Sequence, residues 1–226
     1  MTPERFEKIK NVLKKRQTDL TVIMDNIHKP HNFSAIVRTC DAIGIADVQY
    51  IPVKERYRQL NYYAKGSQKW VEAHKYDDFP SAAKEFQDKG YQLLAAHFSD
   101  QAIDYRDVDY TKPTAIVMGT ELNGISDETA KIVDKHIVVP MQGMVASLNV
   151  SVASAVILFE AQAQRLSAGM YNSRSMQDDR YKKLLFEWSY PRIARMFREK
   201  NQPYPKLDEQ GYFKEEKQNV SDENNR

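Results

Sequence analysis

Short apolar stretches alternate with amphipathic stretches along residues 20–166. The first apolar stretch, "LTVIMD" at Leu20–Asp25, is short and β-branched, which is typical of a buried strand. Similar stretches that predict strands lie at 48–53, 91–98, 114–119 and 136–141. Helical spacing of apolar residues predicts helices over 33–43, 81–90, 126–134 and 147–166. This alternation predicts an α/β fold, with a mostly parallel sheet covered by helices on both faces.

Capping residues mark the ends of several predicted helices. Asn32 stands just before the helix 33–43, where it is well placed as N-cap, and Gly44 can end that helix. Ser126 is placed in the same way at the start of its helix. These residues therefore set the expected helix boundaries.

Helical arms flank this α/β core. Residues 1–19 predict an amphipathic basic helix, and residues 168–213 predict a basic extension whose helices break at Pro191. Residues 214–226 are almost without apolar side chains, so we predict a disordered tail. The α/β domain is then expected to span residues 20–167.

The basic residues concentrate in the two arms. Residues 1–16 hold six Lys or Arg against two acidic residues, and residues 171–206 hold nine against four, although the whole chain has a net charge of only +2. This asymmetry is typical of a polyanion-binding protein. Two solvated helical faces would produce the same charge pattern, and charge alone does not decide between them.

The composition bounds the class of protein. Hydrophobic residues make up 42% of the chain, Cys40 is the single cysteine, and no apolar run approaches the roughly 20 residues of a membrane helix. The charged N-terminus does not resemble a signal peptide. We therefore expect a cytoplasmic globular protein. The five histidines show no convincing metal-ligand spacing, so we expect no metal site.

Three loops that follow predicted strands carry unusual polar residues. They contain "HNFSAIVRT", "TELNGIS" and "QGMVASLNVSVA". Ligand sites in parallel sheets gather beyond the carboxyl ends of strands, so the three loops could meet at one crevice. Taken singly, Asn32 could be only a helix cap, Glu121 a surface carboxylate, and Ser147 or Asn149 the cap of the long helix. Arg38, among apolar residues of the first core helix, could be a simple surface arginine.

The same residues carry a family resemblance. The segments "NFSAIVRT", "MGTELNGIS" and "VPMQGMVASLNVSVASA" resemble the three motifs of the SPOUT superfamily of knotted methyltransferases. The wider sequence, over roughly residues 1–206, resembles the TrmH-type tRNA guanosine 2′-O-methyltransferases of bacteria. The resemblance implies a deep C-terminal trefoil knot, S-adenosylmethionine as cofactor, tRNA as partner, and a homodimer with its active site at the dimer interface.

The resemblance also assigns roles to single residues. The residues that would line the cofactor pocket are Ala96, Gly119, Val139, Met141 and Leu148. Close relatives are expected to have Thr at the position of Ala96. Uncharged lining suits a sulfonium cation and an adenine that needs an apolar slot. Ser147 and Asn149 would supply the few polar contacts that orient the reacting groups.

The resemblance gives the central catalytic role to Arg38. Removing a proton from a guanidinium at pH 7 costs roughly 7.5–9 kcal/mol, so a literal general base is unfavourable. We therefore expect Arg38 to stay charged, to hold the adjacent phosphate and to stabilise negative charge on the ribose 2′-oxygen. Asn32, Glu121 and Asn149 are expected to orient this arginine and the ribose.

Basic side chains are the predicted RNA contacts. Those expected to touch tRNA are Arg5, Lys8, Arg16, Arg58, Arg192 and Arg195. Residues 54–70 mix five Lys or Arg with aromatic residues, which suits splayed nucleotides. An ordinary solvated loop is the alternative.

Other functions remain open from the sequence. Ribosomal-RNA 2′-O-methyltransferases of this superfamily usually carry an extra N-terminal RNA-binding domain, whereas only 19 residues precede the first strand here. Relatives that act on the anticodon wobble position lack the basic C-terminal extension. A catalytically silent RNA-binding or assembly factor would keep the fold but lack methyl transfer.

Overall fold

The computed structural model describes residues 1–27, 29–52, 69–120 and 124–214. The chain forms two compact units. The sheet unit spans Lys15–Ser175, and the helical unit combines Met1–Lys14 with Met176–Arg226. The predicted tail lies outside the described residues from residue 215 onward. In the described part of the chain, no helix is both long and apolar enough to cross a membrane.

The sheet unit is built on seven strands in the order β3-β2-β1-β6-β4-β7-β5. Every pair of neighbouring strands is parallel. The strands are β1 Leu20–Asp25, β2 Asp47–Ile51, β3 Glu72–Lys75, β4 Gln92–Ala96, β5 Ile103–Asp104, β6 Thr114–Met118 and β7 Lys135–Val138. The predicted parallel α/β fold is confirmed. Strands β3 and β5 were not predicted, because "EAHK" and "ID" contain no apolar run.

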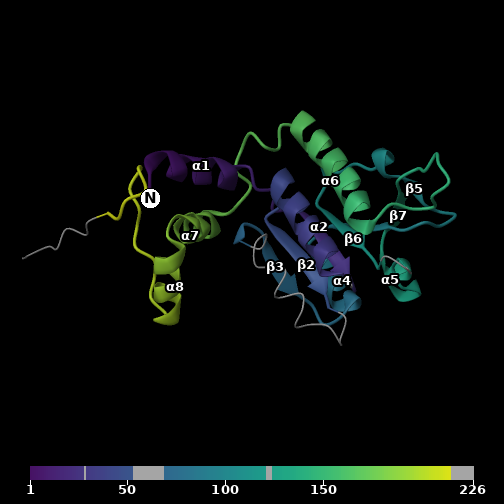
Figure 1. Ribbon diagram of the computed structural model, residues 1–226, viewed down its shortest axis with the longest axis horizontal. Helices are drawn as coiled ribbons and strands as arrows, with labels where there is room; N and C mark the ends of the chain where they lie inside the picture. The colour runs from purple at the N-terminus through teal and green to yellow at the C-terminus, as the bar shows by residue number, and fades with distance from the viewer. Residues whose placement is uncertain (28, 53–68, 121–123, 215–226) are drawn as a thin grey trace, which may run out of the picture. The chain divides into compact units, whose positions relative to one another are not determined.

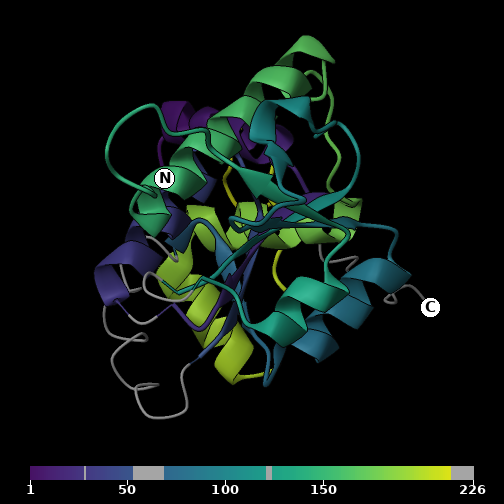
Figure 2. The ribbon, with the colours of Figure 1, turned by 90° about the vertical axis from the view of Figure 1, so that its right-hand side faces the viewer.

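Helices cover both faces of this sheet (Figures 1 and 2). Helices α2 (Pro30–Ile43) and α6 (Val150–Ser167) pack on one face, and α4 (Phe79–Asp88) and α5 (Asp127–Ile132) on the other. Strand β1 shows why: Val22 and Met24 belong to the core beneath α2 and α6, whereas Ile23 belongs to the opposite core. Successive side chains of a strand point to opposite faces of the sheet, so this strand, which is buried on both faces, contributes to two separate cores.

The predicted caps are confirmed at Gly44 and Ser126 but not at Asn32. Gly44 adopts the left-handed conformation after α2, with φ 88°, and the Ser126 side chain accepts the N–H of Thr129 at the start of α5. Helix α2 begins earlier than expected, at Pro30, so Asn32 lies inside its first turn and Lys29 is the N-cap. Proline favours the first helical position because it lacks an N–H to satisfy there.

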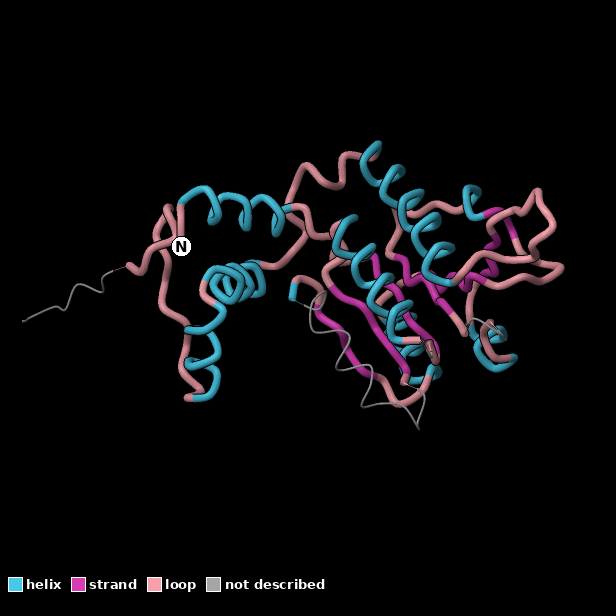
Figure 3. Tube along the Cα trace, in the orientation of Figure 1, coloured by secondary structure: helices cyan, strands magenta, loops and turns pink. Residues whose placement is uncertain are grey.

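The helical unit contains α1 (Pro3–Lys14), α7 (Asp178–Ser189) and α8 (Pro191–Glu199), as Figure 3 shows. The predicted break at Pro191 is confirmed. Apolar residues of α1 are buried, and a Cβ on Gly211 would lie 2.6 Å from the Phe6 ring, so the C-terminal chain packs tightly there. Phe186 stacks on Tyr204 with ring centroids 4.5 Å apart, which gives this small unit an aromatic core.

A buried arginine fastens α6 to the sheet. The Arg165 side chain is fully buried, and its guanidinium forms an ion pair with Asp19 at 2.5 Å. The same side chain donates to the carbonyls of Tyr110 at 2.9 Å and Lys112 at 3.1 Å. Asp19 precedes β1 and Lys112 precedes β6, so one side chain ties α6 to the amino ends of both central strands.

Replacing Arg165 with Met should destabilise the protein by about 3–5 kcal/mol, because Asp19 and the carbonyls of Tyr110 and Lys112 lose their donor. Urea unfolding followed by circular dichroism would measure the loss. The control is Arg106→Met, which removes an exposed ion pair with Asp104 and should change stability little. Equal effects of the two substitutions would contradict the role of Arg165.

Candidate active site

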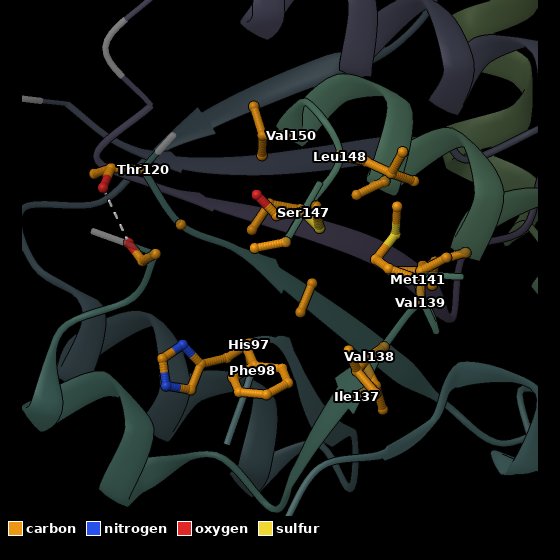
Figure 4. A pocket seen from close by; sticks show the side chains of 17 residues that line it. His97, Phe98, Thr120, Ile137, Val138, Val139, Met141, Ser147, Leu148 and Val150 are labelled. Carbon is orange, nitrogen blue, oxygen red and sulfur yellow. Dashed lines mark hydrogen bonds between the residues drawn. The ribbon is translucent and has the colours of Figure 1, made fainter. Parts of the chain in front are cut away.

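The loops after β4, β6 and β7 surround one pocket of about 300 Å³ (Figure 4). This volume is at the lower end of small-molecule sites. The five residues predicted to bind the cofactor all line it, namely Ala96, Gly119, Val139, Met141 and Leu148. Ser147 lines it as well. The structure thus brings these residues together, and their contact with a cofactor remains a prediction.

Two glycines allow the loop after β6 to close against itself. A Cβ on Gly119 would lie 2.3 Å from the backbone of Gly124, so only glycine fits at this crossing. Next to it, the N–H of Thr120 donates to the Gly124 carbonyl at 2.7 Å, and Gly124 returns a bond of 3.0 Å. Residues 121–123, with the predicted catalytic Glu121, lie outside the described residues.

The described lining of the pocket carries no charged side chain. Its polar side chains are those of His97, Thr120 and Ser147. The Thr120 hydroxyl donates to the Gly124 carbonyl at 3.2 Å. The pocket is therefore an apolar cavity with a few hydroxyl and imidazole groups.

Asn149 links the pocket loop to α2. Its Nδ2 donates to Oδ1 of the buried Asn32 at 3.3 Å, while its own Oδ1 accepts the N–H of Ser151 at 2.9 Å. The cap reading is thus confirmed for Asn149, which is the N-cap of α6. The same side chain also makes the predicted pairing with another motif residue. Capping and site organisation are therefore two effects of one amide.

Arg38 is exposed on α2 and makes no hydrogen bond or ion pair within the described part of the chain. Asn32 and Asn149 contact each other instead of this arginine. Six residues separate Arg38 from Asn32, which turns their side chains to different sides of the helix. A single chain therefore does not show the predicted orientation of Arg38 by these asparagines.

The prediction that Arg16 contacts tRNA is wrong, because its side chain is buried. The guanidinium pairs with Asp41 at 2.5 Å and donates to the carbonyls of Ile45 at 2.8 Å and Trp70 at 2.9 Å. A positive charge in the sequence does not distinguish a surface contact from such a structural anchor. Arg16 instead joins the start of the sheet unit to α2.

The other predicted RNA contacts differ in position. Four of them are exposed on the helical unit: Arg5, Lys8, Arg192 and Arg195. Arg58 and most of the segment 54–70 lie outside the described residues. Each remains a prediction.

Sequence reasoning missed His97 as a pocket residue. Its ring meets that of His136 edge-on, with centroids 5.2 Å apart. Burial and, to a smaller extent, His136 lower the pKa of His97, while Asp127 opposes the shift. A histidine placed directly after an apolar strand, in "LLAAHF", was the available signal.

One group of described residues resembles a metal site. Potential ligand atoms of Asp47, Glu72 and His74 lie within 4.8 Å of one another on β2 and β3. His74 Nε2 lies 2.9 Å from an Asp47 carboxylate oxygen, which is an ordinary surface pair. Strand β1 lies between this group and β6, the nearest strand that borders the pocket.

Comparison with known proteins identifies the family. Residues 19–159 match the SpoU rRNA methylase family, and residues 163–216 match the SpoU rRNA methylase C-terminal family. A tRNA (guanosine(18)-2′-O)-methyltransferase of Escherichia coli K12 is 45% identical over 213 residues, which are 93% of each chain. A protein of the same name from Aquifex aeolicus is 44% identical and covers 85% of this chain and 92% of its own.

Solved structures agree. The A. aeolicus TrmH/SpoU tRNA modifying enzyme superposes with a TM-score of 0.77 at 44% identity, and covers 84% of this chain and 97% of its own. An AdoMet-bound rRNA methyltransferase from Sinorhizobium meliloti has a TM-score of 0.57 at 25% identity, and covers 68% of this chain and 59% of its own. On its sequence and its fold, the chain belongs to the SpoU methylase family.

Proposed function

We propose that this protein methylates the ribose 2′-oxygen of guanosine 18 in the D-loop of tRNA, with S-adenosylmethionine as methyl donor. The observation that carries the proposal is the 45% identity to enzymes of that name across 93% of both chains. Similarity of that extent includes the helical unit as well as the pocket. Action on tRNA also favours a cytoplasmic location.

The pocket suits S-adenosylmethionine, which supplies a methyl group already activated by its sulfonium. No described lining side chain carries a positive charge that would repel the sulfonium or a negative charge that would bind it tightly. Val139, Met141 and Leu148 offer the apolar surface that an adenine needs. Ala96 lacks the hydroxyl expected in close relatives, so any contact at this position would use the backbone.

Arg38 would act on the RNA and not on the cofactor. Its guanidinium is exposed, so it could bind the phosphate beside the target ribose and stabilise negative charge on the 2′-oxygen. The hydroxyl proton then passes to that phosphate or to water. Ser147 would orient the reacting groups, and Asn149, held by Asn32, would fix the loop that carries Ser147.

A homodimer is part of this proposal. Helix α6 exposes large apolar side chains at spacings of seven residues: Val152, Phe159 and Leu166. A stripe repeating every two turns on one helix face is typical of a helix-packing surface. Helix α2, which carries Arg38, packs beside α6, so a second copy on this stripe would lie close to Arg38.

We also infer the trefoil knot of the SPOUT superfamily. The segment 139–149 runs past the carboxyl ends of β4 and β6 before entering α6. The likeness to the A. aeolicus enzyme at a TM-score of 0.77 supports the same path of the chain.

Purified protein should transfer labelled methyl from S-adenosylmethionine to unmodified tRNA at a single D-loop guanosine. Arg38→Ala should lower kcat by about 10²–10³ while leaving cofactor affinity unchanged, because the lost group acts on the transition state. Ribose-methylation-sensitive sequencing maps the product. Cofactor and RNA binding without transfer would favour the silent RNA-binding factor.

The charge state of Arg38 can be tested separately. Arg38→Lys keeps the positive charge but loses the bidentate fork, so it should be slower with the same pH dependence. A pH–rate profile that disappears in Arg38→Lys, with tRNA affinity intact, would contradict a permanently charged arginine.

Phe159→Glu should convert the dimer to a monomer, because it places a carboxylate in the apolar stripe. Light scattering after size exclusion measures the mass. Ser81→Glu adds the same charge to the exposed start of α4 and should leave the dimer intact. A dimeric Phe159→Glu protein would contradict the assignment of this surface.

Arg192→Ala with Arg195→Ala should weaken tRNA binding for all sequences and lower the salt slope of the affinity by about two. Fluorescence anisotropy over a series of salt concentrations measures both quantities. The control is Lys84→Ala, which removes an exposed lysine from α4. An unchanged slope would exclude the two arginines as phosphate contacts.

A further inference from the structure

His97 lines the pocket (Figure 4) but has no role in the mechanism described so far. Its backbone N–H donates to the Ile137 carbonyl at 3.1 Å, which fixes the residue between β4 and β7. A Cβ on Gly124 would lie 3.2 Å from its Nδ1, so the missing side chain there lets the ring approach the loop after β6. Within the described residues, neither ring nitrogen has a hydrogen-bond partner.

The neighbouring His136 has a fixed and complete set of partners. Its Nε2 lies 3.1 Å from the Ala130 carbonyl, which can only accept, so this nitrogen carries a proton. Its Nδ1 lies 2.8 Å from the Ser99 hydroxyl, which can donate to it. His136 therefore needs nothing from His97. The edge-on contact leaves both nitrogens of His97 available to a ligand.

The charge of His97 matters in this pocket. A protonated imidazole would stand in the same small cavity as a sulfonium, and two like charges repel strongly in an apolar surrounding. The titratable groups that face His97 are His136 on β7 and Asp127 at the start of α5. Burial is the largest cause of its lowered pKa, so the neutral form prevails at pH 7 and above.

We propose that His97 is a cofactor-binding residue whose neutral imidazole hydrogen-bonds the nucleoside part of S-adenosylmethionine. This inference rests on the proposed function, because it takes that cofactor as the ligand. The nucleoside offers neutral hydroxyls and ring nitrogens, which match one donor and one acceptor nitrogen. The methionine part carries charges, for which an arginine or lysine would be the usual partner.

The first test compares three ligands by calorimetry: S-adenosylmethionine, S-adenosylhomocysteine and 5′-methylthioadenosine, which lacks the amino-acid part. At pH 8, His97→Ala should weaken all three by a similar factor of about ten. His97→Asn, which keeps a donor and an acceptor, should recover part of the affinity. His74→Ala, outside the pocket, is the control and should leave all three unchanged.

The outcomes separate the two proposals. No binding of any adenosyl compound to the wild-type protein would overturn the proposed function and this inference with it. Normal binding that His97→Ala leaves unchanged would overturn only this inference. Weakening of S-adenosylhomocysteine without weakening of 5′-methylthioadenosine would place His97 at the methionine part and overturn the nucleoside assignment. Thermal unfolding of each variant shows whether the fold is retained.

The second test uses pH. Below the pKa of His97, the wild-type protein should lose affinity for S-adenosylmethionine more steeply than for S-adenosylhomocysteine, because only the former is a sulfonium. In His97→Asn this difference should vanish. The His97 ring signal in NMR should show its pKa falling when S-adenosylmethionine binds. A rise would indicate a carboxylate contact, and equal pH dependence of the two ligands in the wild-type protein would exclude charge repulsion; either result overturns the proposal.

Discussion

The ion pair between the fully buried Arg165 and the partly exposed Asp19 positions α6, whose first turn borders the pocket. It fixes α6 against the amino ends of β1 and β6, and the first turn of α6 in turn fixes the loop that carries Ser147 and Leu148. Burying a guanidinium costs desolvation that Asp19 alone does not offset, so the carbonyls of Tyr110 and Lys112 are needed as well. Because these acceptors have fixed positions, the Arg165 side chain specifies one placement of α6 against the sheet.

The sequence predicts those parts of the fold in which buried residues form a recognisable local run of apolar side chains. Strands β1 and β6 are buried throughout and mostly apolar because both faces of a central parallel strand are covered, so their runs stand out. Strand β3 is an edge strand whose Glu72–Lys75 side chains are mostly polar, and only pairing with β2 makes it a strand. The start of α2 shows a competition between two signals. Asn32 is a good cap, but the helix begins at Pro30, three residues before the predicted start, and Asn32 in its first turn accepts a hydrogen bond from Asn149.

The site is predictable to the extent that topology places strand ends together. Strands β6, β4 and β7 are neighbours, so the residues at or just beyond their carboxyl ends, Gly119, Ala96 and Val139, surround one cavity. Arg16 shows where such reasoning stops, since its charge indicates a surface contact while its surroundings make it an anchor. The orientation of Arg38 could not be derived in this way, because its side chain is exposed and makes no hydrogen bond or ion pair with the described residues.

The separation of charge between pocket and helix surface has a mechanistic consequence. In the described residues the pocket lining is uncharged, and Arg38 lies outside it on α2. A sulfonium and a guanidinium repel each other, so a site with both cations and no anion would be unfavourable. In the proposed mechanism, the phosphate beside the target ribose would neutralise Arg38 as the hydroxyl approaches the methyl group. On that proposal, the protein would hold its cofactor before the catalytic site is complete, and binding of the RNA backbone would complete that site.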